Sequence, residues 1–361
     1  MKLGCSAFSV LRIPSLSSTL HYRPLCSSSL SPPQYQSKLK TPLYLRPPIF
    51  TASSSDFTKW HNWAKNLASS VGSSFLQSDN GPDADLLRRE LKWLIQDAVE
   101  DHSLIPQLGT QNNLTNVRLR ACLDELYSLW RQRIEERRPF QYVVGCEHWR
   151  DLVLCVQEGV LIPRPETEMV VDLVGDLVGS SEDFSEGLWV DLGTGSGAIA
   201  VGIGRLVGAQ GRVIATDLSP VAVEVATYNA QRYGLQDIIK IRKGSWFEPL
   251  KDVEGKLAGL VSNPPYIPSN DISGLQAEVG RHEPKIALDG GINGLDSLIH
   301  LTNGAASMLK PGGFFAFETN GEKQCKFLVD HMENNYSKHF FNVKIISDYA
   351  GIQRFVTGFR Q

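Results

Sequence analysis

Apolar residues recur at the spacing of an amphipathic helix between residues 56 and 139. Over residues 82–100 they stand three or four positions apart behind Asp83 and Asp85, and acidic residues are common where a helix begins. A second such pattern follows Asn116 and ends at residue 139; its apolar face is Leu119, Leu123, Leu126, Trp130 and Ile134. The two patterns predict a small helical bundle over residues 56–139, and simple packing and the binding of a partner protein account for it equally well.

The pattern becomes that of β-strands between residues 140 and 162. Apolar runs cover residues 142–144, 152–156 and 160–162, with Gly145 after the first run and a Gln-Glu-Gly turn before the last. A β-hairpin that joins two domains fits this arrangement. At residues 163–168, Pro-Arg-Pro-Glu-Thr-Glu predicts the start of a helix, because proline and acidic residues favour the first helical turn. Arg164, held between two prolines, either points its charge into a cleft or belongs to this capped helix start.

From residue 163 to the end, apolar runs of strand length alternate with helical patterns. The expected strands cover residues 188–190, 212–215, 238–241, 257–261, 314–317, 342–346 and 353–359. The expected helices cover residues 165–178, 198–207, 221–232 and a stretch from residue 322. Strands that alternate with helices predict an α/β domain at residues 163–361 with a doubly wound, mostly parallel sheet.

Composition adds a special amino terminus to this picture. The 361 residues are 42% apolar with a net charge of −3, as in an ordinary soluble globular protein. Residues 1–55, however, hold six Lys and Arg, many serines and no Asp or Glu, which is the composition of an organelle transit peptide and weakly favours a plastid over a mitochondrion. A basic tail that stays attached is the alternative. Without these six charges the chain would carry −9, which argues against a non-specific nucleic-acid surface.

Other classes of protein find no support in the sequence. No apolar run reaches the roughly 18 residues of a membrane span. The six cysteines form no Cys-x-x-Cys pair and the eight histidines show no ligand spacing, so we expect free thiols and no metal site.

A glycine loop lies where the strand at residues 188–190 turns into the helix at residues 198–207. Gly193, Gly195 and Gly197 suit positive φ angles and close approach of the backbone to a ligand. Asp217 ends the next strand, where a carboxylate can accept both hydroxyls of a ribose. A dinucleotide and S-adenosylmethionine both fit, because Gly193-x-Gly195-x-x-Ala198 also satisfies the relaxed dinucleotide fingerprint. A P-loop is excluded, since no Gly-Lys-Ser/Thr is present.

The strand at residues 257–261 runs into Asn263, Pro264, Pro265 and Tyr266. Two prolines end the strand and leave carbonyls without a neighbouring N–H. The Asn263 side-chain oxygen and a proline carbonyl can each accept one N–H of a planar NH2 group, while the tyrosine ring stacks on its plane. Alone, the tetrapeptide is also compatible with a turn and a core tyrosine.

Together, these segments favour methyl transfer over hydride transfer. Ligands of open α/β sheets bind at the carboxyl ends of the strands, where the glycine loop, Asp217 and Asn263 are all expected. Two acceptors on an NH2 group push electron density onto its nitrogen and help it attack an electrophilic carbon. A dehydrogenase has no use for such a site.

The chain resembles the release-factor glutamine methyltransferases from about Arg118 to Phe359. The motifs that carry the resemblance are Arg-Pro-Phe-Gln-Tyr at residues 138–142, Leu-Ile-Pro-Arg-Pro-Glu-Thr-Glu at 161–168, Asp-Leu-Gly-Thr-Gly-Ser-Gly at 191–197, Trp-Phe at 246–247 and Ser-Asn-Pro-Pro-Tyr at 262–266. One difference is Ser245, where the family often has an aspartate. The resemblance implies an amino-terminal helical bundle, a connecting β-hairpin and the seven-stranded sheet of a class I methyltransferase.

The resemblance also implies an activity and roles for single residues. Family members methylate the side-chain amide of the glutamine in the Gly-Gly-Gln loop of peptide-chain release factors, with S-adenosyl-L-methionine as methyl donor. The residues that would bind this cofactor are Gly193, Thr194, Gly195, Ser196, Gly197, Asp217, Trp246 and Asn263. Those that would bind and activate the glutamine amide are Asn263, Pro264, Pro265 and Tyr266, with Arg164 as a further substrate contact.

We therefore expect an enzyme of the chloroplast stroma, or else of the mitochondrion, that acts on an organellar release factor as a monomer. The nearest alternative is an adenine-N6 methyltransferase of DNA or RNA, since the exocyclic amine of adenine suits the same tetrapeptide. The acidic body and the lack of a basic, aromatic domain argue against such direct nucleic-acid binding. A ribosomal-protein glutamine methyltransferase and an inactive, cofactor-binding assembly factor are further alternatives.

Overall fold

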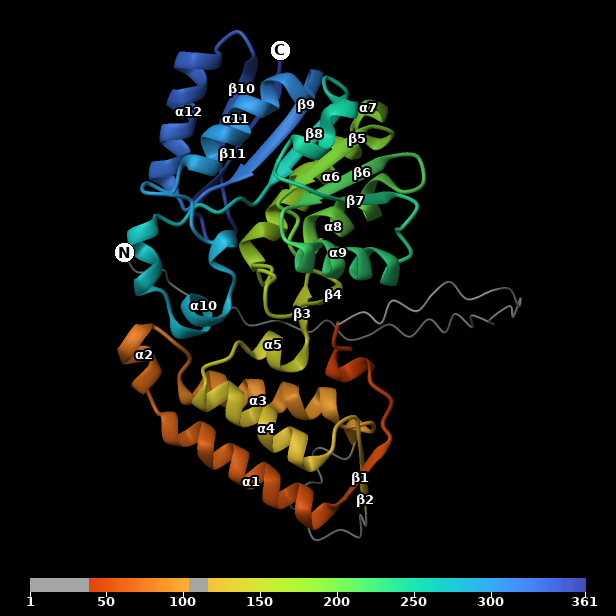
Figure 1. Cartoon of the computed structure of the whole chain (residues 1–361), viewed down its shortest axis with the longest axis vertical. Coiled ribbons are helices and arrows are strands. Elements are labelled where there is room, and N and C mark those ends of the chain that lie inside the picture. The colour runs from red at the N-terminus through yellow and green to blue at the C-terminus, as the bar shows by residue number, and fades with distance from the viewer. Residues whose placement is uncertain (1–38, 104–115) are drawn as a thin grey trace, which may run out of the picture. The chain divides into compact units, whose positions relative to one another are not determined.

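The computed structural model of the protein describes residues 39–103 and 116–361 (Figure 1). The predicted transit peptide at residues 1–55 therefore lies mostly outside the described residues, and only its last part can be compared with the structure.

A seven-stranded sheet forms the centre of the carboxyl-terminal region, with the strand order β10-β11-β9-β8-β5-β6-β7 (Figure 1). The five strands from β9 to β7 pair in parallel, and β11 pairs antiparallel with both β9 and β10. The strands are β5 (Leu188–Leu192), β6 (Arg212–Asp217), β7 (Ile239–Lys243), β8 (Leu257–Ser262), β9 (Leu309–Glu318), β10 (Phe340–Ser347) and β11 (Gln353–Arg360). This sheet confirms the predicted fold class.

Helices cover both faces of the sheet, as a doubly wound fold requires. The core of one face receives apolar side chains from α6 (Glu168–Val178), α8 (Ala198–Val207) and α9 (Pro220–Arg232). The core of the other face receives them from α11 (Asp296–Met308) and α12 (Glu322–Tyr336). Because all six residues of β8 are buried between these layers, its sequence shows no alternation of apolar and charged residues.

Short helices occupy several connections of this region. They are α7 (Glu182–Ser185), α10 (Ala277–His282) and the 3₁₀ turns η3 (Pro165–Thr167), η4 (Glu248–Val253), η5 (Ser269–Gly274) and η6 (Lys285–Ala287). The turn η3 matters for the site, because it brings Thr167 to the end of the sheet where the tetrapeptide at residues 263–266 lies.

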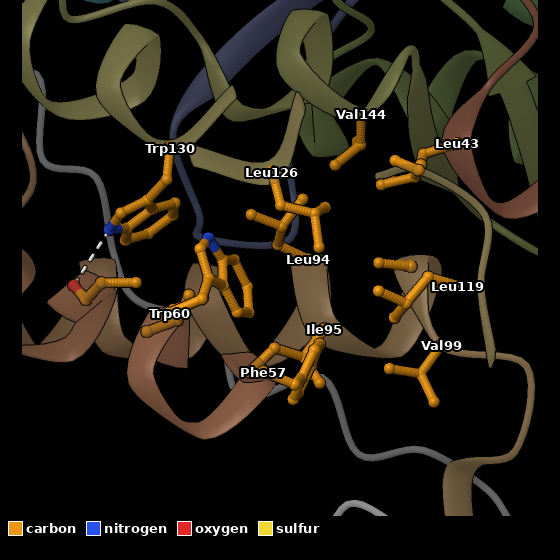
Figure 2. Close-up of a cluster of buried hydrophobic side chains, with 14 of the residues drawn as sticks. Leu43, Phe57, Trp60, Leu94, Ile95, Val99, Leu119, Leu126, Trp130 and Val144 are labelled. Atoms are coloured by element: carbon orange, nitrogen blue, oxygen red, sulfur yellow. Dashed lines mark hydrogen bonds between the residues drawn. The ribbon is translucent and has the colours of Figure 1, made fainter. Parts of the chain in front are cut away.

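The amino-terminal region contains the predicted helical bundle. Its helices are α1 (Ser54–Val71), α2 (Ser74–Asp79), α3 (Ala84–Ala98) and α4 (Leu123–Glu135). Their common core includes the fully buried indoles of Trp60 and Trp130 (Figure 2). The indole N–H of Trp130 donates to the backbone oxygen of Ala64 on α1 at 3.0 Å, which satisfies a polar atom inside this core.

One residue assigned to a helix by its spacing lies in a strand instead. Leu119 belongs to β2 (Asn116–Leu119), which pairs antiparallel with β1 (Phe50–Ser53), and α4 begins only at Leu123. The strand depends on a partner far away in the sequence, so local spacing alone could not indicate it.

The other half of this pair lies in the segment predicted as transit peptide. Residues 39–55 are folded: Leu43 in the turn η1 (Leu43–Leu45) is fully buried, β1 pairs with β2, and Ser53 caps the start of α1. The folded region therefore begins at least 17 residues before the predicted boundary at residue 56. The boundary at residue 56 is therefore too late, because a basic, serine-rich composition does not distinguish a leader from a short segment that packs against a core.

We expect Leu43→Ala to lower the free energy of unfolding by about 2 kcal/mol, near the low end for buried leucines, because a terminal segment can detach locally. Leu45 in the same turn is 39% exposed, so Leu45→Ala is a matched control with an effect within about 0.5 kcal/mol. Denaturant unfolding of the full chain measures both. Equal midpoints for the two variants would show that this segment does not stabilise the fold.

The predicted hairpin is present but shorter than residues 140–162. It consists of β3 (Cys146–Trp149) and β4 (Leu152–Cys155), which pair antiparallel. The apolar run at residues 142–144, predicted as a strand, lies in the short helix α5 (Phe140–Val144). Pro139 precedes this helix and Gly145 ends it in the left-handed conformation at φ 82°, so the two breakers outweigh the β-propensity of the valines.

Two features that other classes of protein require are absent from the described residues. Within residues 39–103 and 116–361, no helix is long and apolar enough to cross a membrane. In the same part of the chain, no three His, Cys, Asp or Glu side chains lie together as metal ligands would. Cys122, Cys146, Cys155 and Cys325 are free thiols, as predicted for them.

Candidate active site

The glycine loop, Asp217 and Asn263 follow three adjacent strands of the sheet. The loop comes after β5, Asp217 ends β6 on one side of it, and Asn263 comes after β8 on the other side. Because these strands are parallel, their carboxyl ends meet at one edge, as the sequence predicted.

The glycine loop is held by backbone bonds and leaves space on one side. The N–H groups of Gly193 and Thr194 both donate to the Thr216 oxygen on β6 at 2.9 Å. Gly195 has φ 55°, and a Cβ atom there would meet nothing within 4 Å, so this glycine faces open space. Gly197 has φ 82°, and a Cβ atom there would lie 3.2 Å from Ala226 on α9. The first of these two positions suits a ligand and the second suits close packing of the helix.

Asp217 holds this loop through its side chain. One carboxylate oxygen accepts from the Gly195 N–H at 2.9 Å, and the other accepts from the Ser219 N–H at 2.8 Å. Burial raises the pKa of this carboxyl, although both hydrogen bonds act in the opposite direction. Each carboxylate oxygen has a second lone pair, so ribose hydroxyls can still donate to Asp217.

Asp191, at the end of β5, is a site residue to which the sequence reasoning assigned no role. Its Oδ2 accepts from the Thr194 hydroxyl at 2.5 Å and from the Ala200 N–H at 3.2 Å. Its Oδ1 is buried and has no hydrogen-bond partner among the described residues. Burial raises the pKa of Asp191 to about 7. The position of this acid at the start of the glycine motif was the only signal in the sequence.

Asn263 and Tyr266 are linked through two further side chains. The Asn263 NH2 group donates to the Thr167 hydroxyl at 3.1 Å, and this hydroxyl donates to Glu318 at 2.7 Å. The Tyr266 hydroxyl donates to the other oxygen of Glu318 at 3.2 Å. Between them, Pro264 is buried and Pro265 is partly exposed. Thr167 and Glu318 were not predicted as site residues, although Thr167 lies in one of the motifs and Glu318 ends β9, the strand next to β8.

Two other predicted site residues have different surroundings. Trp246, with φ 44°, has its ring beside Gly193, 3.7 Å from where a Cβ atom of that glycine would lie, so it borders the glycine loop. Arg164 forms an ion pair with the buried Glu283 and donates to the Ile162 oxygen at 2.8 Å. These contacts join the start of the helix to the segment that follows α10. A contact between Arg164 and the substrate stays a prediction.

Comparison with known proteins identifies the family. The model for ribosomal protein L11 methyltransferase (PrmA) matches residues 165–263, a stretch that holds the glycine loop and Asp217 and ends at Asn263. The release factor glutamine methyltransferase of Synechocystis sp. is 36% identical over 306 residues, which are 84% of this chain and 96% of that protein. The one from Gloeobacter violaceus is 43% identical over 274 residues, which are 75% of this chain and 90% of that protein. The chain belongs to the release factor glutamine methyltransferases.

Membership in this family confirms two predictions, that the protein is a protein-glutamine methyltransferase and that its cofactor is S-adenosylmethionine. A solved structure of a ribosomal protein L11 methylase from Lactobacillus delbrueckii subsp. bulgaricus is 20% identical, with a TM-score of 0.38 over 57% of this chain and 83% of that chain. A likeness this low carries no argument about function.

The side chains at this site fit the cofactor. The unpaired Oδ1 of Asp191 leaves a buried acceptor at the loop, and a buried acceptor normally has a partner. The open side of Gly195 lets a ligand approach the backbone, and Asp217 offers acceptors for ribose hydroxyls beside it. The flat ring of Trp246 at the same loop suits an adenine.

We expect Asp217→Ala to weaken binding of S-adenosylhomocysteine at least about tenfold, because charged hydrogen bonds to the ribose contribute about 1.5–3 kcal/mol each. Isothermal titration of the full chain measures this affinity. The exposed Asp237, just before β7, provides the control Asp237→Ala, which should bind normally. An unchanged dissociation constant in Asp217→Ala would remove this residue from the cofactor site.

Proposed function

We propose that this protein methylates the side-chain nitrogen of the glutamine in the Gly-Gly-Gln motif of organellar peptide-chain release factors. The observation that carries the proposal is the Asn263 side chain at the carboxyl end of β8, one strand away from the glycine loop on β5. Relatives named release factor glutamine methyltransferase, which match most of the chain, support this choice of substrate.

An amide nitrogen is a poor nucleophile because its electron pair is delocalised into the carbonyl group. When bound, S-adenosylmethionine would supply the electrophilic methyl group and, with its S–CH3 bond broken, leave as S-adenosylhomocysteine. The Asn263 side-chain oxygen and the Pro264 carbonyl would each accept one N–H of the glutamine, which moves electron density onto the nitrogen and stabilises the positive charge that develops there. Tyr266 would flank the planar amide. The methylated nitrogen releases its extra proton readily, so the site needs no strong base.

Alignment of the two reactants accounts for most of the rate gain in this scheme. Well-oriented reactants gain on the order of 7–11 kcal/mol over free ones, provided that the site fixes both. Tyr266 is itself fixed: its backbone oxygen accepts from Gln324 of α12 at 2.9 Å, and its hydroxyl is bound to Glu318. Such rigid support is what a positioning mechanism requires.

The proposed location is the chloroplast stroma, with the mitochondrion as the alternative. It is supported by the basic, serine-rich composition of residues 1–55, which lack Asp and Glu. Because residues 39–55 are folded, we expect cleavage at or before residue 39. Import of the full chain into isolated chloroplasts and mitochondria, followed by sequencing of the new amino terminus, tests both points. Uptake by neither organelle, or cleavage after the buried Leu43, would contradict them.

The choice of substrate is tested by a parallel assay with labelled S-adenosylmethionine. The full chain is incubated with a plastid release factor, a mitochondrial release factor, organellar ribosomal proteins, and DNA and RNA that contain adenine. We expect label on the plastid release factor and on none of the others. Label on nucleic acid alone, or on a ribosomal protein alone, would replace the proposal with the corresponding alternative.

A further inference from the structure

Four side chains form one hydrogen-bonded chain behind the tetrapeptide. They come from three separate segments: Thr167 from η3, Asn263 and Tyr266 from the segment after β8, and Glu318 from the end of β9. Thr167 is 4% exposed and Glu318 is 1% exposed, so water does not compete for these bonds. A buried network of hydrogen bonds of this kind holds its side chains in one arrangement.

The direction of each bond follows from the chemistry of the groups. An ionised carboxylate only accepts, so the hydroxyls of Thr167 and Tyr266 must both donate to Glu318. Since Thr167 donates its hydroxyl proton to Glu318, its hydroxyl oxygen can only accept a hydrogen bond from Asn263. The NH2 group of Asn263 is therefore turned toward Thr167, and its carbonyl oxygen points away from it.

Burial opposes the ionised form of Glu318 that this argument needs, whereas two hydrogen bonds and the charge of Arg354 support it. Burial raises its pKa to about 7, and the nearby Glu166 acts in the same direction, while the bonds from Thr167 and Tyr266 and the positive charge of Arg354 lower it. Arg354 on β11 is itself paired with the buried Asp348 at 2.9 Å. Glu318 is thus ionised above neutral pH and gains a proton as the pH falls through about 7.

We propose that Thr167 and Glu318 are positioning residues, which present the carbonyl oxygen of Asn263, and not its NH2 group, to the NH2 group of the substrate. A reversed Asn263 amide would place two NH2 groups against each other and supply no acceptor. The inference rests on the proposed function for its consequences in catalysis, and on the hydrogen bonds alone for the orientation of Asn263.

The first test compares Thr167→Val, which removes the hydroxyl at nearly constant volume, with Thr167→Ser, which keeps it. With a plastid release factor as substrate, we expect Thr167→Val to lower kcat roughly tenfold and Thr167→Ser to stay within about twofold of the wild type. The affinity for S-adenosylhomocysteine should be unchanged in both. Thr302 of α11 is another fully buried threonine, and Thr302→Val controls for the mere loss of a buried hydroxyl. Equal kcat values for Thr167→Val and the wild type would overturn the proposal.

The second test uses the pH dependence of kcat at saturating cofactor. In the wild type kcat should fall as the pH decreases through about 7. A protonated Glu318 can donate to Thr167, so it no longer fixes which groups donate and which accept in these hydrogen bonds. Glu318→Gln should lower kcat at pH 8 and lose this dependence. Glu90→Gln removes another buried carboxylate, in α3, and should keep the wild-type profile. A wild-type profile in Glu318→Gln would exclude Glu318 as the group that sets the orientation.

A third measurement does not depend on the substrate. In protein labelled with ¹⁵N at asparagine, the side-chain NH2 signals of Asn263 are assigned by their loss in Asn263→Asp. We expect contacts of these protons with Thr167 and slow exchange with solvent, both lost in Thr167→Val. Absence of these contacts in the wild type would refute the orientation, whereas their presence without release-factor methylation would leave the orientation standing and refute only the proposed substrate.

Discussion

Asn263→Ala is expected to lower kcat for glutamine methylation by at least roughly tenfold to a hundredfold, because it removes one of two acceptors that stabilise positive charge on the attacking nitrogen. The loss appears in kcat, since this charge develops only in the transition state. Single-turnover kinetics with a plastid release factor and saturating S-adenosylmethionine measure it. The affinity for S-adenosylhomocysteine should fall much less than kcat, because the glycine loop and Asp217 are left intact.

A control for this variant comes from α11. Asn303 on α11 accepts a hydrogen bond from Tyr336 through its side-chain oxygen, as Asn263 is proposed to do from the substrate. Asn303→Ala removes an acceptor of the same kind away from the site, and we expect wild-type kcat from it. Turnover at the wild-type level in Asn263→Ala would remove the basis for assigning the methyl-transfer site to this tetrapeptide.

Glu278→Ala is expected to destabilise the protein by about 3–5 kcal/mol, the usual cost of breaking a buried ion pair by removing one partner. Glu278 on α10 accepts from Arg137 at 2.6 Å and from Arg133 of α4 at 3.0 Å, and Arg133 also pairs with Glu90 of α3. Arg133 is 2% exposed and Arg137 is 6% exposed, so water cannot replace the lost carboxylate.

Denaturant unfolding at neutral pH measures this loss. Burial alone would raise the pKa of Glu278, but the hydrogen bond from Arg137 and the charge of Arg133 hold it below its usual value. Its contribution is therefore fully present above the ordinary pKa of a glutamate, about 4.3, and is lost only as the pH falls below that value. The exposed pair of Glu322 and Lys326 gives the control Glu322→Ala, with an expected cost below about 1 kcal/mol. Equal stability of the two variants would show that the buried ion pairs do not hold α10 in place.

The sequence identified the parts of the site that follow from strand ends. The glycine loop, Asp217 and Asn263 each end an apolar run, and parallel strands in a doubly wound sheet bring such ends together. The nature of the side chains then limited the chemistry to a planar NH2 group and a ribose-containing cofactor. No information beyond local pattern and general topology was needed for these residues.

The supporting residues could not be found in this way. Thr167 and Glu318 lie 151 positions apart, and their contact depends on how η3 packs against the end of β9. For Arg164, sequence reasoning could not anticipate the ion pair with Glu283, 119 positions away. In the helical region, β1 and β2 require each other, so neither could be assigned from its own four residues. Long-range pairing of this kind leaves no periodic signal in the sequence.

The most direct test of the central claim is mass spectrometry of a plastid release factor after incubation with the full chain and S-adenosylmethionine. We predict a single added methyl group on the side-chain nitrogen of the glutamine in the Gly-Gly-Gln motif, absent when that glutamine is replaced by alanine and when Asn263→Ala is the enzyme. A release factor that stays unmodified while DNA, RNA or a ribosomal protein gains the methyl group would contradict the account.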